Sequence, residues 1–179
     1  MTNIIKTTDY TFSENDRILI DANIWLLIYG INSSRIDPGY SEVLGKMKEG
    51  NAQLFVNSAI ISEYINTTTR IAASNYQRTV WQSEHRSKKF NYKQNYRPTK
   101  DFEENYFIAI ESAKEEILKD ACLIQISQSQ ISNALQCINM LDFNDQLIVN
   151  NAMDNHLSIL TDDRDYLKIP TEINIFRLN

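Results

Sequence analysis

Acidic side chains stand close to the ends of several predicted strands. Asp21 directly follows the apolar run of the first predicted strand, and Asp162 and Asp163 follow that of a later one. Glu63 lies about one turn into the helix predicted after the second strand, and Asp145 lies near the start of another helix. Carboxylates gathered at one place repel one another strongly unless a cation joins them. Carboxylate and water oxygens suit Mg²⁺ or Mn²⁺, so these residues predict a divalent-metal site.

Each acid also has a purely structural interpretation. Asp21 could cap the helix that follows it, and Glu63 could be an exposed helix residue. Asp142 and Asp145 fit the N-cap and N3 positions of a helix start. The negative charges of three further acids could stabilise the N-terminus of a short helix by interacting with the helix dipole. These acids are Asp162, Asp163 and Asp165.

The elements that must position these acids alternate between strand and helix. Short apolar runs predict strands over residues 18–21, 53–57, 122–126, 157–161 and 173–176. Helical spacing predicts helices over residues 24–29, 38–50, 58–74, 101–119, 129–138 and 143–155. Alternation of this kind predicts one α/β domain over residues 1–179, a three-layer α/β/α sandwich with a mainly parallel sheet of four to five strands. Sites in such sheets form beyond the carboxyl ends of the strands, where several of the acids fall.

The charge of the chain is unevenly distributed. The net charge is −5, yet residues 76–100 carry +6, which leaves −11 for the remainder. Aromatic residues are interleaved with the cations, so this segment could hold a phosphate backbone and stack on unpaired bases. It could equally be a solvated loop with its rings tucked into the domain, or a docking site for a protein partner or a second subunit. The predicted RNA-binding cations are Arg78, Arg86, Lys88, Lys89, Lys93 and Arg97.

The sequence favours a cytoplasmic protein without a membrane segment. No apolar run approaches the roughly 18 residues that span a bilayer, and the first residues lack the apolar core of a signal peptide. Cys122 and Cys137 lie in apolar stretches and are expected to be reduced and buried. No Cys/His cluster predicts zinc.

Four segments resemble the motifs of PIN-domain nucleases, the family of the VapC-type toxins. They are ILIDANIWL, SAIISEYIN, DFNDQLIVNNAM and LSILTDDRDY, in the order that the family shows. The resemblance implies a PIN-like fold with four catalytic, metal-binding acids, which map to Asp21, Glu63, Asp145 and Asp163. Further candidate metal ligands are Asp142 and Asp162, and the supporting residues are Asn23, Thr161 and Asp165.

The resemblance further implies a metal-dependent endoribonuclease that uses Mg²⁺ or Mn²⁺ on RNA. The toxin of a toxin–antitoxin pair fits that description, with an antitoxin or a second copy of the chain as its partner. Two features depart from the family. Asn150 and Asn151 stand where small apolar residues are usual, and the segment 75–120 is longer than in compact members.

Two other functions compete with this interpretation. A phosphohydrolase of the haloacid dehalogenase type also has an Asp after its first strand, but it needs a second Asp where this chain has Asn23. A PIN-like scaffold could bind RNA or protein without cutting. A degenerate acidic site would favour the scaffold, whereas all four acids are present here.

Overall fold

The protein is built around one six-stranded sheet whose strands all run parallel. The computed structural model describes residues 2–30, 36–85, 88–137, 141–168 and 172–178, and the strand order is β1-β6-β5-β2-β3-β4. The predicted α/β architecture is confirmed, with one strand more than expected. The strands are β1 (Asn3–Lys6), β2 (Arg17–Ile20), β3 (Gln53–Asn57), β4 (Cys122–Ile124), β5 (Ser158–Leu160) and β6 (Asn174–Arg177).

The extra strand, β1, lies at the edge of the sheet. It pairs in register with β6, from Asn3 opposite Asn174 to Lys6 opposite Arg177. Its side chains are largely exposed, so it lacks the apolar run that marks a buried strand. Pairing with β6, far away in sequence, therefore fixes this strand, which local pattern does not reveal.

Strand β2 occupies the middle of the sheet and explains the apolar run before Asp21. Leu19 lies opposite Phe55 of β3 on one side and Ile159 of β5 on the other. Ile18, Leu19 and Ile20 are fully buried. Because a parallel sheet is covered on both faces, its central strands are apolar at every position rather than at alternate ones. The same pairing sets the end of β2 beside the end of β5.

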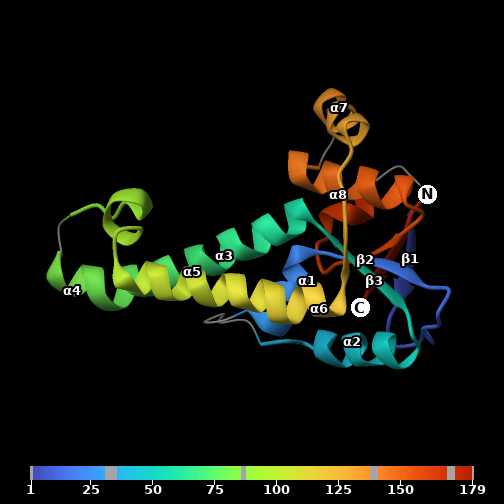
Figure 1. Ribbon diagram of the computed structural model, residues 1–179, viewed down its shortest axis with the longest axis horizontal. Helices are drawn as coiled ribbons and strands as arrows, with labels where there is room; N and C mark the ends of the chain where they lie inside the picture. The colour runs from blue at the N-terminus through green and yellow to red at the C-terminus, as the bar shows by residue number, and fades with distance from the viewer. Residues whose placement is uncertain (1, 31–35, 86–87, 138–140, 169–171, 179) are drawn as a thin grey trace.

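Helices flank the sheet on both sides. In Figure 1, α7 (Gln128–Gln136) and α8 (Phe143–Asp154) lie above the strands, and α2 (Tyr40–Glu49) lies below them. Helix α1 (Ala22–Tyr29) follows β2 directly and packs against α3 (Ser58–Tyr76). None of the described helices is long and apolar enough to span a bilayer.

Helices α3 and α5 (Lys100–Ser112) form an arm that extends away from the sheet (Figure 1). The far end of the arm contains η1 (Gln77–Trp81), α4 (Gln82–Glu84) and η2 (Tyr92–Tyr96), and η3 (Ala113–Ile117) and α6 (Leu118–Asp120) lead back to β4. The arm has an apolar core of its own, separate from the main core. It comprises Ala72, Ala73, Tyr76, Phe90, Tyr92, Tyr96 and Phe102.

Helix α3 is capped by Asn57, and α5 is capped by Thr99, while the Asp101 carboxylate accepts a hydrogen bond from the Tyr96 hydroxyl at 2.7 Å. The expectation about the cysteines needs correction. The cysteines are free, as expected, but both are exposed. Cys122 lies on the edge strand β4, which has a neighbour on one side only.

Candidate metal-binding site

Asp21 lies directly after the central strand β2, and hydrogen bonds fix its carboxylate. Its Oδ1 accepts a hydrogen bond from the backbone N–H of Ala22 at 2.7 Å, so Asp21 also caps the helix, as the alternative structural interpretation had it. Its Oδ2 accepts hydrogen bonds from the Thr161 hydroxyl and the Asn23 amide, both at 2.7 Å. Asp21 is only 4% exposed, and burial raises its pKa to about 7. The neighbouring carboxylates of Glu63 and Asp145 contribute to that rise.

Glu63 approaches the same place from α3. The side chain of Asn57, the last residue of β3, accepts a hydrogen bond from the N–H of Ile60 at 3.0 Å and so starts the helix at the carboxyl end of the strand. Glu63 is partly buried, which raises its pKa, and the carboxylates of Asp142 and Asp163 raise it further. It therefore faces two acids from other segments and is not the solvated helix residue of the alternative interpretation.

Asp142 and Asp145 come from the first turn of α8. Asp142 caps this helix by accepting a hydrogen bond from the N–H of Asp145 at 2.9 Å, as the N-cap pattern predicted. Asp145 is partly buried, and burial is the main reason that its pKa rises to about 6. The charges of Asp142, Asp163 and Glu63 also raise this pKa. The capping pair thus lies among the other acids.

Asp163 belongs to the loop between β5 and the short helix η4 (Asp165–Lys168). Its backbone N–H donates to the Thr161 hydroxyl oxygen at 3.0 Å. Its Oδ1 accepts a hydrogen bond from the N–H of Asp165 at 2.8 Å. Its charge contributes to the raised pKa values of Glu63 and Asp145. The backbone of the loop thus orients the Asp163 carboxylate toward those two acids.

The structure therefore gathers five acids from four separate segments, which we call the acidic cluster: Asp21, Glu63, Asp142, Asp145 and Asp163. In the described part of the chain, no three acidic, His or Cys side chains lie close enough together to coordinate one metal ion. The cluster is thus a concentration of negative charge that is wider than a ready-made coordination sphere. Burial and mutual repulsion both oppose its ionisation, and a bound cation would relieve that cost.

Asn23 and Thr161 join the first and last motifs. The Asn23 amide donates to the Thr161 hydroxyl oxygen at 3.0 Å as well as to Asp21, and its Oδ1 accepts a hydrogen bond from the N–H of Asp162 at 3.2 Å. Thr161 is fully buried and in turn donates to Asp21. These two side chains join the end of β2 to the end of β5 through their hydrogen bonds.

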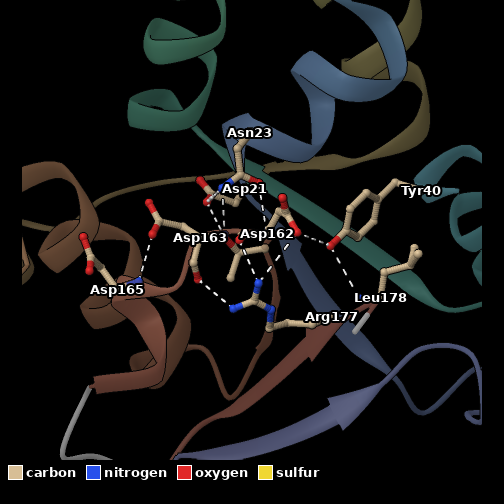
Figure 2. A network of polar contacts seen from close by, with 9 residues as sticks. Asp21, Asn23, Tyr40, Asp162, Asp163, Asp165, Arg177 and Leu178 are labelled. Atoms are coloured by element: carbon tan, nitrogen blue, oxygen red, sulfur yellow. Dashed lines mark hydrogen bonds and ion pairs between the residues drawn. The ribbon is translucent and has the colours of Figure 1, made fainter. Parts of the chain in front are cut away.

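Two predicted acids are not brought into the cluster. Figure 2 shows that the Asp162 carboxylate is directed to the other side of the loop, where it accepts a hydrogen bond from the Tyr40 hydroxyl at 3.0 Å and lies 3.7 Å from Arg177 Nη2. Asp165 forms an ion pair with Lys168 at 2.7 Å. Successive residues of an extended loop point in opposite directions, so Asp162 and Asp163 cannot both face the cluster.

Tyr166 is a residue of the site that the sequence did not single out. It is fully buried, and its hydroxyl donates a hydrogen bond to Asp145 Oδ1 at 3.1 Å. Burial raises the pKa of Tyr166 far above its ordinary value, and Asp21, Asp145 and Glu63 raise it further, so the residue stays a donor. The only sequence signal was an aromatic residue at the end of the last motif.

The predicted RNA-binding cations lie on the arm. Arg78, Lys88, Lys89, Lys93 and Arg97 are exposed, whereas Arg86 lies outside the described residues. At 1.5 Å per residue, Arg78 is roughly 20 Å along the helix from Glu63. That separation exceeds the Debye length of about 8 Å at physiological salt, so these charges do not neutralise the acidic cluster.

The aromatic residues of the arm serve its own core. The ring of Tyr96 is buried between those of Tyr76, Tyr92 and Phe102, at centroid distances of 5.4–5.8 Å. Trp81 stacks on His85 at 4.0 Å. The interpretation in which the rings are tucked away is therefore correct for Tyr96, and base stacking on that ring is excluded in this arrangement.

Comparison with known proteins finds similar structures but no matching family. No protein-family model matches this chain, and no curated protein matches it. The fold is similar to that of a chain in the crystal structure of VapBC2 from Rickettsia felis bound to a DNA fragment from their promoter, with a TM-score of 0.52. The similarity covers 89% of this chain and 97% of the other, at 16% sequence identity. At that identity the likeness concerns the fold alone, and the fold is PIN-like.

Proposed function

We propose that this protein is a metal-dependent endoribonuclease, in which Asp21, Glu63, Asp145 and Asp163 hold Mg²⁺ or Mn²⁺. The observation that carries the proposal is the convergence of acids from four segments, with the pKa values of three of them raised. Repelling carboxylates weaken a fold, so a site that retains them serves a purpose that compensates for the cost. The PIN-like fold shared with a VapBC2 chain supports the same function.

The donor atoms fit a hard divalent cation. All are carboxylate oxygens near the carboxyl end of a parallel sheet, without a thiolate or imidazole among them. When bound, Mg²⁺ or Mn²⁺ supplies a water of lowered pKa and neutralises charge on a phosphate during in-line attack. Because the carboxylates are spread more widely than one coordination sphere, we expect their side chains to move inward when the ion binds.

The surrounding residues have distinct tasks in this scheme. Thr161 and Asn23 keep Asp21 in one orientation by donating to the same oxygen, Oδ2. Tyr166 does the same for Asp145 Oδ1 and leaves its second oxygen for the ion. Such outer hydrogen bonds fix the direction of ligands and raise affinity for the metal. Asp142 approaches the cluster from the cap of α8 and would orient a water.

We propose that the substrate is RNA and that the protein acts in the cytoplasm. An acidic cluster repels a phosphate backbone, so cations elsewhere must hold the strand. Lys88, Lys89 and Lys93 at the far end of the arm are exposed, and none of them forms an ion pair among the residues that the structure describes. They would contact phosphates some distance from the cut, as positioning contacts without sequence preference.

We further propose that the protein is the toxin of a toxin–antitoxin pair. The structural neighbour is a chain of a VapBC2 complex, which supports a protein partner for this fold. Exposed apolar side chains on α5 offer a surface for such a partner, with Phe107 63% exposed and the adjacent Ile108 41% exposed. Induction of the parent should arrest growth, whereas induction of Asp145→Asn should not.

The decisive experiment is a cleavage assay on mixed RNA with Mn²⁺, Mg²⁺ or EDTA. We expect cleavage with either metal, none with chelator, and loss of at least about 100-fold in rate for Asp21→Asn and Asp145→Asn, because each removes a charge that binds the ion. Asp9→Asn is the matched control, since Asp9 is exposed and lines a hollow beside Lys46 and Glu49 of α2, with no residue of the cluster in its lining. Far-UV circular dichroism would establish that each variant folds.

Two results would contradict the proposal. Equal rates for the parent and both cluster variants would remove the catalytic assignment. No cleavage by the parent, together with no stabilisation by Mn²⁺ in a thermal melt, would favour the alternative of a PIN-like scaffold that binds RNA or protein without cutting.

A further inference from the structure

Arg177 is a buried cation directly behind the loop that carries Asp163. It is the last residue of β6, an interior strand between β1 and β5, and it is 6% exposed. Its Nη2 donates a hydrogen bond to the backbone oxygen of Asp162 at 2.9 Å, and its Nη1 makes a longer one to that of Asp163 at 3.4 Å. One guanidinium thus holds two successive carbonyl groups of the loop (Figure 2).

Asp162 is the counter-ion of this buried arginine. Its Oδ1 lies 3.7 Å from Arg177 Nη2 and accepts a hydrogen bond from the hydroxyl of Tyr40 at 3.0 Å. Tyr40 is fully buried at the start of α2, and its hydroxyl oxygen also accepts the N–H of Leu178 at 3.4 Å. A carboxylate with these partners has its charge compensated where it is, so nothing draws it toward the acidic cluster.

The loop is consequently fixed from both of its sides. On the cluster side, the side-chain oxygen of Asn23 accepts a hydrogen bond from the N–H of Asp162. The hydroxyl oxygen of Thr161 accepts one from the N–H of Asp163. On the opposite side, Arg177 holds the carbonyls of the same two residues. When the N–H and C=O groups of two neighbouring residues are all engaged, the peptide planes cannot rotate, and the direction of the Asp163 side chain is set.

We propose that Arg177 is a positioning residue for the metal site, with Asp162 as its counter-ion and not as a ligand. This inference rests on the proposed function for its consequence in metal binding. Arginine suits the task because its planar group presents several N–H donors in fixed directions, so one side chain can hold two carbonyls and a carboxylate. Lysine carries the same charge without that fork and would hold the loop less well.

The test compares Mn²⁺ affinity and loop mobility in four variants. Arg177→Met should lower Mn²⁺ affinity about tenfold or more, as loss of an outer hydrogen bond to a metal site typically does. It should also speed amide hydrogen exchange across residues 161–165. Arg177→Lys should fall between the parent and Arg177→Met. Asp162→Asn should weaken Mn²⁺ binding by less than Asp163→Asn, which should abolish it.

Arg17→Met is the matched control. Arg17 starts the central strand β2 at the amino end of the parallel strands, opposite to the end that carries the acidic cluster, and likewise donates to a backbone carbonyl, that of Asn155, at 3.0 Å. This variant loses a similar bond and should leave Mn²⁺ affinity and exchange of residues 161–165 unchanged. A general loss of stability would affect Arg17→Met and Arg177→Met alike, whereas a positioning role separates them.

The outcomes distinguish this inference from the proposed function. If Mn²⁺ binds the parent and Arg177→Met equally and loop exchange is unchanged, Arg177 is not a positioning residue. If Asp162→Asn abolishes Mn²⁺ binding as fully as Asp163→Asn, Asp162 is a ligand and the inference is wrong. If the parent binds no Mn²⁺, the proposed function fails, and loop exchange alone decides: faster exchange supports the role of Arg177 and unchanged exchange overturns it. Should Arg177→Met not fold, Arg177→Lys is judged by the same two measurements.

Discussion

The hydroxyl of Tyr166 donates a hydrogen bond to Asp145 Oδ1 at 3.1 Å, inside a cluster of carboxylates that raises the pKa of both residues. The bond works against that trend for Asp145, since it stabilises the ionised carboxylate and lowers its pKa. It is made by a fully buried side chain, so water cannot readily replace it. Tyr166 therefore helps to keep Asp145 charged and pointed in one direction.

Tyr166→Phe should weaken metal binding in a pH-dependent way. Without the hydroxyl the pKa of Asp145 rises above about 6, so more of the carboxyl is protonated in mildly acid solution. We expect Mn²⁺ affinity to fall about tenfold near pH 6 and by less near pH 8, where Asp145 is ionised in both proteins. Isothermal titration calorimetry at the two pH values measures this. Tyr10→Phe is the control. The hydroxyl of Tyr10 also donates a hydrogen bond to a carboxylate, that of Asp16 at 2.7 Å, but Asp16 is not part of the acidic cluster. An equal loss at both pH values would contradict the account.

Asp145→Asn should stabilise the metal-free protein at neutral pH. The pKa of Asp145 is about 6 in the folded protein against an ordinary value of 3.8, so the folded state holds the proton more tightly. The resulting contribution to stability is complete below about pH 4 and is lost as the pH rises through about 6. Asparagine can still accept the Tyr166 hydrogen bond and never ionises. We expect the free energy of unfolding of the variant to exceed that of the parent by on the order of 1 kcal/mol at pH 7.5. This difference is smaller than the full pKa shift would give, because Asp145 is only partly buried and solvent screens its charge.

Urea unfolding in EDTA at about pH 4.5 and pH 7.5 measures the difference. The two proteins should be closer in stability at the lower pH, and Asp9→Asn should behave as the parent at both. Added Mn²⁺ should reverse the order at pH 7.5, because only the parent gains from the ion. A variant that is less stable than the metal-free parent at both pH values would show that the carboxylate of Asp145 stabilises the fold.

Replacing Lys88 and Lys89 on the arm with Ala should weaken RNA binding mainly at low salt. Each phosphate contact contributes about 0.7 to the slope of log affinity against log salt for a single strand, so the slope should flatten by up to about 1.4. Fluorescence anisotropy with a labelled RNA across several salt concentrations measures it. A double substitution of Lys46 and Lys119, which are exposed elsewhere, is the control. Binding that is unchanged at every salt would remove the arm from the RNA-binding surface.

Asn151→Ala should destabilise the fold more than an ordinary polar substitution. Asn151 is fully buried, and its side chain forms three hydrogen bonds. Its oxygen accepts one from the Asn57 amide at 3.1 Å. Its amide donates one to the Gln125 backbone carbonyl at 2.9 Å and one to the Gln130 side-chain oxygen at 3.1 Å. Its loss leaves buried polar groups without partners, so we expect a cost of about 2–3 kcal/mol. Urea denaturation measures it, beside Asn66→Ala, whose bond to Ser62 is exposed. Equal stability of the two variants would contradict this.

This network also explains the departure from the family pattern at 150–151. Asn57 uses its oxygen to cap α3 and its amide to hold Asn151 of α8. One side chain therefore ties the helix that carries Glu63 to the helix that carries Asp145. Asn150 likewise accepts a hydrogen bond from the Gln146 amide at 2.8 Å and donates one to the Gln130 carbonyl at 3.2 Å. The motif alone showed two polar residues in an unusual place, and only their partners in the fold explain them.

The sequence by itself determined the α/β class and five of the six strands, and it offered the cap at Asp21 and the capping pair at Asp142 and Asp145 as alternatives that the structure bears out. These features depend on apolar runs, helical spacing and neighbours within four residues, all of which can be read along the chain. The tertiary structure decided the rest. Only the fold brings Asp163 close to Glu63 and Asp145 and directs the neighbouring Asp162 to Arg177. Only the fold brings the Tyr166 hydroxyl to Asp145. Only the fold pairs β1 with β6. The physical reason is that the energy of a charge or a hydrogen bond depends on distance in space, and distances between remote segments exist only after the strands have paired.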